Sequence, residues 1–181
     1  ADLVSFRQLM RLAALRTGQV LNISDLGRDA KLNTATSTRY LNLLETSFMF
    51  RKLEPYLGNK SARLIKSPKI YISDSGLACY LSGINDCKSN RSVFGAYYET
   101  FVMQNLCSII DAKWPGARIY FWNIQGRHEV DFVIESNQET IAIEVKMSSR
   151  WKDNDLNGLR AFVERTPHCK AGVLAYNGQE M

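Results

Sequence analysis

The sequence predicts a two-part protein of mixed α and β structure, at the border of the α+β and α/β classes, and three patterns support this. Apolar residues recur at helical spacing near the start of the chain, period-two strand patterns dominate the second half, and a polar stretch separates the halves. The chain has 181 residues, of which 45% are hydrophobic and 23% charged, as in ordinary globular domains. We therefore expect one domain at 1–83, a linker at 84–92 and a second domain at 93–181.

The first domain is predicted to contain three helices followed by two strands. Gly18 is a suitable stop for the first helix, and Asn22 and Asn33 are suited to cap the next two helices. Strand-like runs follow at 48–53 and 64–72. Three helices followed by a hairpin is the order of a winged helix-turn-helix. The third helix is expected to bury Leu41, Leu44 and Phe48.

The second domain is predicted to contain a mixed sheet covered by helices. Three strands separated by short turns should form an antiparallel meander. A last strand follows a helix, so it is expected to lie parallel to the third strand, inside the sheet. The first helix is expected to pack through Tyr98, Phe101, Val102, Leu106 and Ile109. The order of helix, three strands, helix and strand occupies 95–111, 118–122, 128–135, 140–146, 153–164 and 171–176.

Two carboxylates and a lysine lie inside these predicted strands. Because side chains alternate along a strand, Glu144 and Lys146 share one face of the third strand. Neighbouring strands lie about 4.8 Å apart, so Asp131 in the second strand can approach Glu144. Converging carboxylates can hold Mg²⁺ or Mn²⁺, which would polarise a phosphate oxygen and activate a bound water. Lys146 would then orient that water or stabilise charge on the phosphate, and Glu99 on the preceding helix would add a metal contact.

The alternative interpretation is that Asp131, Glu144 and Lys146 are strand charges that pair with one another on a solvent-facing side of the sheet. Their apolar neighbours argue against it, since Asp131 lies between Val130 and Phe132. Burying charges costs free energy unless they serve a site. If Asp131 and Glu144 converge, a metal-dependent phosphodiesterase site is favoured.

Several stretches carry a resemblance to a known family when they are taken together and in order. They are 12–18, 37–45, 66–78, Gly95 with 98–102, 129–134 and 143–146. In these the chain resembles the C-terminal region of a prokaryotic AAA-type ATPase family, in which an ATPase domain precedes a winged helix and a domain of unknown function similar to PD-(D/E)XK, restriction-endonuclease-like nucleases. The resemblance implies catalytic roles for Glu99, Asp131, Glu144 and Lys146, with the three acids as metal ligands. No G-x-x-x-x-G-K-[ST] motif occurs here, so ATP would bind only in an upstream domain of the same polypeptide.

Residues suited to nucleic acid lie mainly in the first domain. The start of its third helix is small and hydroxyl-rich. A basic wing on or beside the hairpin would be formed by Arg51, Lys52, Lys60, Arg63 and Lys66. The alternative is a winged helix that packs against its own ATPase domain or another protomer. In the second domain, Trp151 is expected to cap the sheet edge, with stacking on a base as the alternative. The residues expected to contact DNA are Thr34, Thr36, Ser37, Thr38, Arg39, Arg63 and Lys66.

Composition bears on partners and compartment. A net charge of +5 and a pI of about 9.1 favour acidic partners such as nucleic acid. The four cysteines form no C-x-x-C pair, so reduced thiols in the cytoplasm are expected rather than a zinc site or disulfides. No signal peptide or long apolar run is present, so no membrane span is expected. The first residue is not Met, which suggests part of a longer protein.

The sequence therefore predicts the C-terminal part of a prokaryotic ATPase that binds DNA and carries a Mg²⁺- or Mn²⁺-dependent deoxyribonuclease site. A homo-oligomer is compatible with this prediction. The alternative is a non-catalytic protein-interaction or oligomerisation module that regulates the upstream ATPase.

Overall fold

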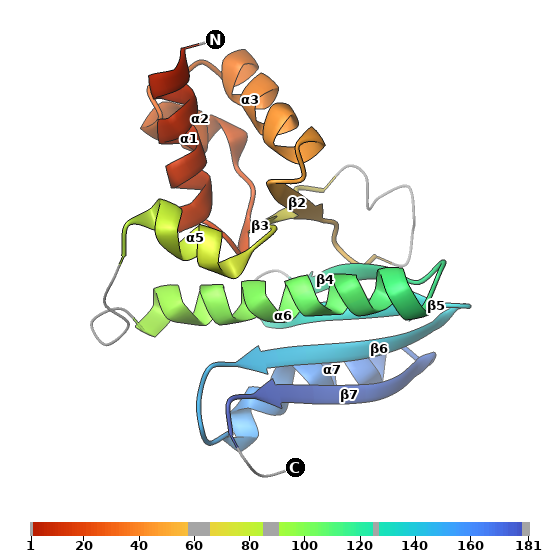
Figure 1. Cartoon of the computed structure of the whole chain (residues 1–181). Helices are drawn as coiled ribbons and strands as arrows, with labels where there is room; N and C mark the ends of the chain where they lie inside the picture. Colours follow the sequence, from red (N-terminus) through yellow and green to blue (C-terminus); the bar gives the residue numbers. More distant parts are fainter. Residues whose placement is uncertain (1, 58–65, 85–90, 125–126, 179–181) are drawn as a thin grey trace. The chain divides into compact units, whose positions relative to one another are not determined.

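The structure is a computed structural model that describes residues 2–57, 66–84, 91–124 and 127–178 (Figure 1). The chain divides into two compact units. The first unit contains Ala1–Lys52 and Ser67–Phe101, and the second contains Leu53–Lys66 and Val102–Met181. Most of the predicted linker at 84–92 lies outside the described residues, which stop at Ile84 and resume at Arg91.

The first unit combines helices with a three-stranded sheet of strand order β1-β3-β2. Its elements are α1 (Leu3–Leu15), β1 (Gln19–Val20), α2 (Ile23–Asp29), α3 (Thr34–Thr46), β2 (Phe50–Leu53), β3 (Lys69–Ile72) and α5 (Ser75–Ser82). The predicted caps are confirmed, because Oδ1 of Asn22 accepts from the Asp25 N–H and Oδ1 of Asn33 from the Thr36 N–H. The sequence does not predict β1, which pairs antiparallel with β3 after Gly18 turns the chain with a φ of +78°.

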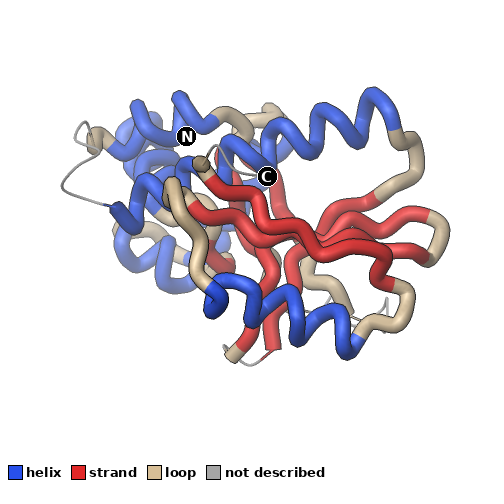
Figure 2. The backbone as a smooth tube through the Cα atoms, turned by 90° about the horizontal axis from the view of Figure 1, so that it is seen from below, coloured by secondary structure: helices blue, strands red, loops and turns tan. Residues whose placement is uncertain are grey.

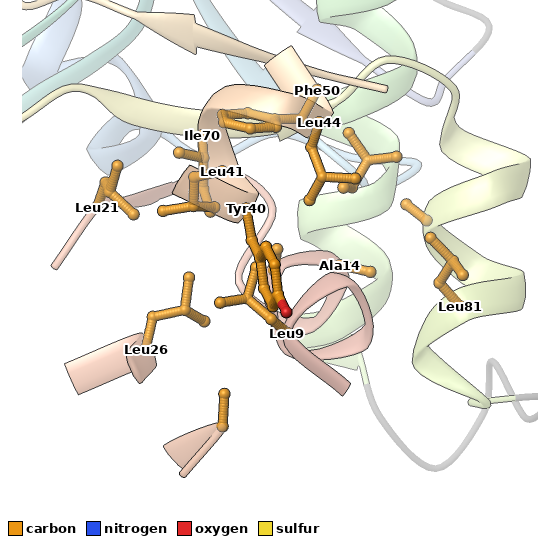
Figure 3. Close-up of a cluster of buried hydrophobic side chains, with 14 of the residues drawn as sticks. Leu9, Ala14, Leu21, Leu26, Tyr40, Leu41, Leu44, Phe50, Ile70 and Leu81 are labelled. Carbon is orange, nitrogen blue, oxygen red and sulfur yellow. The ribbon is translucent and has the colours of Figure 1, made fainter. Parts of the chain in front are cut away.

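The core of the first unit gathers side chains from its helices and its sheet, several of which Figure 3 labels. Leu41 and Leu44 of α3 are buried as predicted, but Phe48 is 80% exposed, so that prediction is wrong. The helix ends at Thr46 and Phe48 adopts a φ of +56°, so Phe48 no longer follows the helical stripe. Tyr40 belongs to the buried stripe instead and meets the ring of Phe6 edge-on.

The second unit is built on a four-stranded mixed sheet of order β4-β5-β6-β7 (Figures 1 and 2). Its strands and later helices are β4 (Arg118–Ile124), β5 (His128–Ser136), β6 (Glu139–Lys146), the 3-10 helix η1 (Asp153–Leu156), α7 (Asn157–Arg165) and β7 (Cys169–Tyr176). The predicted meander of β4, β5 and β6 is confirmed, and so is the parallel direction of β7. The prediction that β7 lies inside the sheet is wrong, because β5 already occupies the other side of β6 and the crossover can add β7 only at the edge.

Two elements cover parts of this sheet. The helix α7 lies across one face, where Leu159, Ala161 and Phe162 pack with Trp122 and other strand residues (Figure 1). The segment after β2 runs beside β4, because the Tyr56 N–H donates to the Phe121 carbonyl at 2.6 Å. One edge of the sheet is therefore partly covered, whereas β7 forms the other edge within the described residues.

The helix α6 (Arg91–Lys113) continues from the first unit into the second. Its predicted apolar face is wrong at Phe101 and Ile109, which are 51% and 50% exposed, whereas Tyr98, Val102 and Leu106 are half-buried. The residues that it buries are Tyr97, Thr100, Met103, Cys107 and Ile110. In the described residues, no helix combines the length and the apolar character that crossing a membrane requires.

Candidate functional site

A β-bulge lies at Asp131 in β5. The register between β4 and β5 leaves Asp131 and Phe132 both opposite Phe121, so two residues of one strand face a single residue of the other. As a result, Val130 and Val133 pack into one apolar cluster, although regular alternation would place them on opposite faces. Bulges of this kind redirect a side chain and end regular pairing. The bulge thus gives Asp131 a direction that alternation alone does not predict.

The sheet opens between β5 and β6 beside this bulge. The last antiparallel pair before the opening joins Phe132 to Ile143. Beyond it, Oδ2 of Asp131 accepts a hydrogen bond from the Val145 N–H at 2.8 Å, so a side-chain carboxylate replaces a backbone acceptor. Asp131 is only 8% exposed. The opening therefore holds a buried carboxylate against the part of β6 that carries the other predicted site residues.

Glu144 and Lys146 form an ion pair on one face of β6. Lys146 Nζ lies 2.6 Å from Glu144 Oε1, and the two side chains are 34% and 10% exposed. Ala142 precedes them on the same face and packs in the apolar cluster under α7. The pair thus stands where the face covered by α7 gives way to solvent.

The surroundings of Lys146 determine its protonation. Burial lowers the pKa of Lys146, but the hydrogen bond with Glu144 and the negative charges of Glu144, Asp131 and Asp155 outweigh burial and raise this pKa above its ordinary value of 10.5. Lys146 is therefore protonated at neutral pH. It can donate to water or to an anion.

The donor atoms of the site suit a magnesium-type ion. Asp131 and Glu144 offer the carboxylate oxygens that Mg²⁺ and Mn²⁺ prefer. In the parts of the chain that the structure describes, no group of three or more His, Cys, Asp and Glu side chains could hold a metal ion. Magnesium commonly binds through one or two carboxylates and keeps water and phosphate oxygens as its other ligands. The two carboxylates of Asp131 and Glu144 therefore suit an ion whose other ligands are water and substrate, rather than an ion held by protein ligands alone.

Glu99, the fourth predicted site residue, lies in the part of α6 that belongs to the first unit. Its Oε1 accepts a hydrogen bond from the Tyr71 hydroxyl at 2.5 Å and lies 3.4 Å from Lys69 Nζ. Lys69 and Tyr71 are 4% and 1% exposed. Beside them, the hydroxyls of Thr17 and Thr100 lie 2.8 Å apart. Within the first unit, Glu99 thus takes part in a buried polar cluster that joins β3 to α6.

The residues predicted to contact DNA differ in exposure. Thr34 and Arg39 of α3 are exposed, whereas Ser37 is fully buried and donates its hydroxyl to the Asn33 carbonyl. Ser37 is buried because α2 approaches it closely at a glycine: a Cβ on Gly27 would lie 2.6 Å from Ser37 Oγ. Thr36 and Thr38 are half-buried and Lys66 is exposed, while Lys60 and Arg63 lie outside the described residues.

Spacing along the strands does not reveal one further acid of the site. Asp155 lies in η1, and its charge contributes to the raised pKa of Lys146. It is held in place because Oδ2 of Asp155 accepts from the Lys152 N–H at 2.8 Å. Nothing in the predicted helix at 153–164 marks Asp155 as close to Lys146, so the sequence does not predict this interaction.

Comparison with known proteins gives two matches to families and two similar proteins. Residues 1–88 match a domain of unknown function, DUF8612, and residues 94–181 match another, DUF4143. Uncharacterised proteins of Mycobacterium tuberculosis and Mycobacterium bovis are each 31% identical to the chain over 147 residues. The alignment covers 80% of this chain and 32% of either relative, so the chain spans about a third of their length.

Proposed function

We propose that the second unit is a nuclease-like domain with a Mg²⁺- or Mn²⁺-dependent phosphodiesterase site, and that the first unit is a winged helix that binds DNA. One observation carries the proposal for the site. The Asp131 carboxylate spans the opening between β5 and β6 by binding the Val145 N–H, next to the Glu144–Lys146 ion pair. The order α6, β4, β5, β6, α7, β7 agrees with the α-β-β-β-α-β order of the nuclease fold that the sequence resembles.

The chain's own residues have distinct parts in this proposal. Asp131 and Glu144 would hold the ion, and the ion would supply a polarised phosphate oxygen and an acidified water. Lys146 is protonated, so it would donate to that water or to the phosphate as negative charge develops. The negative charge of Asp155 contributes to the raised pKa of Lys146. Glu99 is proposed as a further acid of the site by resemblance alone.

The cleavage test compares two glutamates of the same strand. Glu144→Gln keeps the shape of the side chain and removes its charge, so metal binding should weaken and cleavage should fall by about 100-fold or more. Glu139→Gln is the matched control, because Glu139 begins β6 at its far end and pairs there with Lys170 in an exposed ion pair. Cleavage of single-stranded, flapped and duplex DNA is measured on gels with Mn²⁺ or Mg²⁺.

Thermal unfolding of both variants checks that the fold is kept. Equal cleavage by Glu144→Gln and Glu139→Gln would contradict the assignment of Glu144 to the phosphodiesterase site. Absence of cleavage by the unaltered chain with every substrate and metal would favour the alternative, a non-catalytic interaction or oligomerisation module that regulates an ATPase. The edge strand β7 supports that alternative, because Ala171, Gly172 and Val173 are exposed along it.

The proposal for DNA binding rests on α3 and on the basic residues near the hairpin. Arg39 is exposed, and its guanidinium carbon lies 5.7 Å from the centroid of the Tyr40 ring, which limits its freedom. Thr34, Thr36 and Thr38 share the start of this helix. Lys52 is tied to Glu45 by an ion pair of 2.7 Å, so it is a weaker candidate than the sequence suggests.

A second test concerns Arg39 and measures binding rather than cleavage. Arg39→Gln should weaken binding to duplex DNA, and the slope of log affinity against log salt concentration should become shallower by about one unit. Arg28→Gln is the control, because Arg28 is an exposed arginine of the neighbouring helix that pairs with Asp25. Fluorescence anisotropy of labelled duplex over a salt series gives both quantities. If the two variants have the same salt slope, Arg39 does not contact phosphate.

The context of these two activities is proposed from the resemblance and from the length of the relatives. Both mycobacterial proteins are longer than this chain, and the alignment leaves most of their length unmatched. We infer an ATPase domain upstream in the same polypeptide, which would couple ATP hydrolysis to the handling of DNA by a prokaryotic, cytoplasmic protein.

A further inference from the structure

An open hollow of about 450 Å³ lies beside the Glu144–Lys146 pair in the second unit. Leu174 and Tyr176 of β7 line the hollow, and the parallel register sets Leu174 next to Glu144 and Tyr176 next to Lys146. Paired residues of neighbouring strands point to the same face of a sheet. The part of the hollow at Leu174 and Tyr176 therefore lies on the same face of the sheet as the ion pair, one strand away from it. The volume is in the range of about 300–1,000 Å³ that is usual for small-ligand sites.

Small residues leave this space open and fix one of its walls. Gly172, Ala175 and Gly178 line the hollow without filling it. A Cβ on Gly178 would lie 2.1 Å from Cε2 of Tyr176 and 2.7 Å from the Ser149 carbonyl oxygen. The backbone at Gly178 therefore lies directly against the Tyr176 ring and limits its movement. The Tyr176 ring is therefore already ordered on one side of the hollow before a ligand binds.

An exposed aromatic side chain with cationic neighbours in the sequence lies at the rim of the hollow. Trp151 lines the hollow and is 48% exposed, and the exposed residues Arg150 and Lys152 flank it in the sequence. Aromatic side chains among positive charges are how proteins bind single strands, since bases stack on the rings while cations follow the phosphates. Asp155 accepts a hydrogen bond from the Lys152 N–H, and Asp153 is paired with Arg160.

We propose that this hollow receives an unstacked nucleobase, so that the adjoining site acts on unpaired nucleic acid, such as single-stranded ends and flaps, in preference to uninterrupted duplex. Bases inside a duplex are stacked and cannot enter such a hollow unless they are first turned out of the helix. The nucleotide next to the stacked base would bring its phosphate toward Lys146. Assigning that phosphate as the one cleaved rests on the function proposed above, whereas binding of the base does not.

The test measures binding without cleavage. A fluorescein-labelled oligothymidylate is titrated with the whole chain in Ca²⁺, and a blunt duplex is titrated in parallel. Trp151→Ala should weaken binding of the single strand by about 10-fold, since stacking on an aromatic ring contributes strongly to single-strand affinity. Trp151→Phe keeps a ring and should stay within about threefold of the unaltered chain. Trp114→Ala is the matched control, because Trp114 lies in the same unit and is 47% exposed but does not line the hollow.

The outcomes separate this inference from the proposed nuclease activity. Binding that depends on Trp151 without any cleavage in Mn²⁺ would support the base site and contradict the phosphodiesterase. Equal affinities of Trp151→Ala and Trp114→Ala for the single strand would overturn the base site. The base site would also be overturned if Trp151→Ala lowered the affinities for single strand and duplex equally, or if the unaltered chain did not bind the oligothymidylate. A shift from dimer to monomer caused by Trp151→Ala in sedimentation, with unchanged nucleic-acid binding, would assign the hollow to a protein contact.

Discussion

Replacing Gly158 by alanine is expected to destabilise the second unit by about 3 kcal/mol or more. Gly158 is near the start of α7, and a Cβ at this position would lie 1.9 Å from the carbonyl oxygen of Glu129 in β5. The obstacle is backbone, so no side chain can turn aside to make room. The helix would have to move away from the sheet, which would loosen the packing of Leu159 and Phe162. A loss of 3 kcal/mol corresponds to a fall in Tm of about 6–12 °C for a chain of this size.

Gly95→Ala is the control for this prediction. Gly95 lies in α6, and nothing approaches within 4 Å of a Cβ placed there. Alanine favours a helix over glycine by about 1 kcal/mol, so this variant should be as stable as the original chain or slightly more so. Thermal unfolding followed by circular dichroism compares the two variants. Equal melting temperatures would mean that α7 does not lie as close to β5 as the structure has it.

Replacing Lys69 by methionine is expected to have the second large effect, in the first unit. Lys69 Nζ lies 3.4 Å from Glu99 Oε1, and Lys69 is 4% exposed. Removing one partner of a buried pair leaves a charge without compensation, which costs about 3–5 kcal/mol. Because the Tyr71 hydroxyl still donates to Glu99, we expect a loss near 3 kcal/mol. Unfolding in urea measures it.

An exposed pair supplies the comparison for Lys69. Lys170 and Glu139 lie 3.0 Å apart with side chains 61% and 58% exposed, so Lys170→Met should change stability by less than about 0.5 kcal/mol. Combining Lys69→Met with Glu99→Gln removes the isolated charge and should restore part of the loss. If Lys69→Met is as stable as Lys170→Met, the pair contributes nothing to the fold, and a role of Glu99 beyond the first unit gains weight.

The sequence predicts those parts of the fold that depend on local signals. Asn22 and Asn33 cap their helices as expected, because a side-chain oxygen next to a free backbone N–H needs no distant partner. The meander follows from short turns between alternating strands. The exposed position of Phe48 and the edge position of β7 were not predictable in this way, since one depends on a left-handed backbone turn and the other on which strand is already paired.

In the candidate site, too, some features follow from local sequence signals and others depend on tertiary contacts. Placing Glu144 and Lys146 on one face required only period two, and the ion pair agrees with it. The way in which Asp131 meets β6 could not be predicted, because it depends on a bulge and on a hydrogen bond to Val145 across an opened ladder. The charge of Asp155, which lies in η1, acts on Lys146, and period two along β6 does not predict this interaction. Local pattern thus predicts which residues share a face, whereas the contacts of Asp131 and Asp155 depend on tertiary structure.

The bulge in β5 also affects how relatives of this chain should be compared. It adds one residue on β5 opposite Phe121, so the positions that face α7 change phase between Val130 and Val133. A relative that lacks one residue there could keep every strand and its apolar core, yet its aspartate would point to the other face. For this stretch, an alignment that keeps the residue count of the bulge is more informative than one that keeps the highest identity.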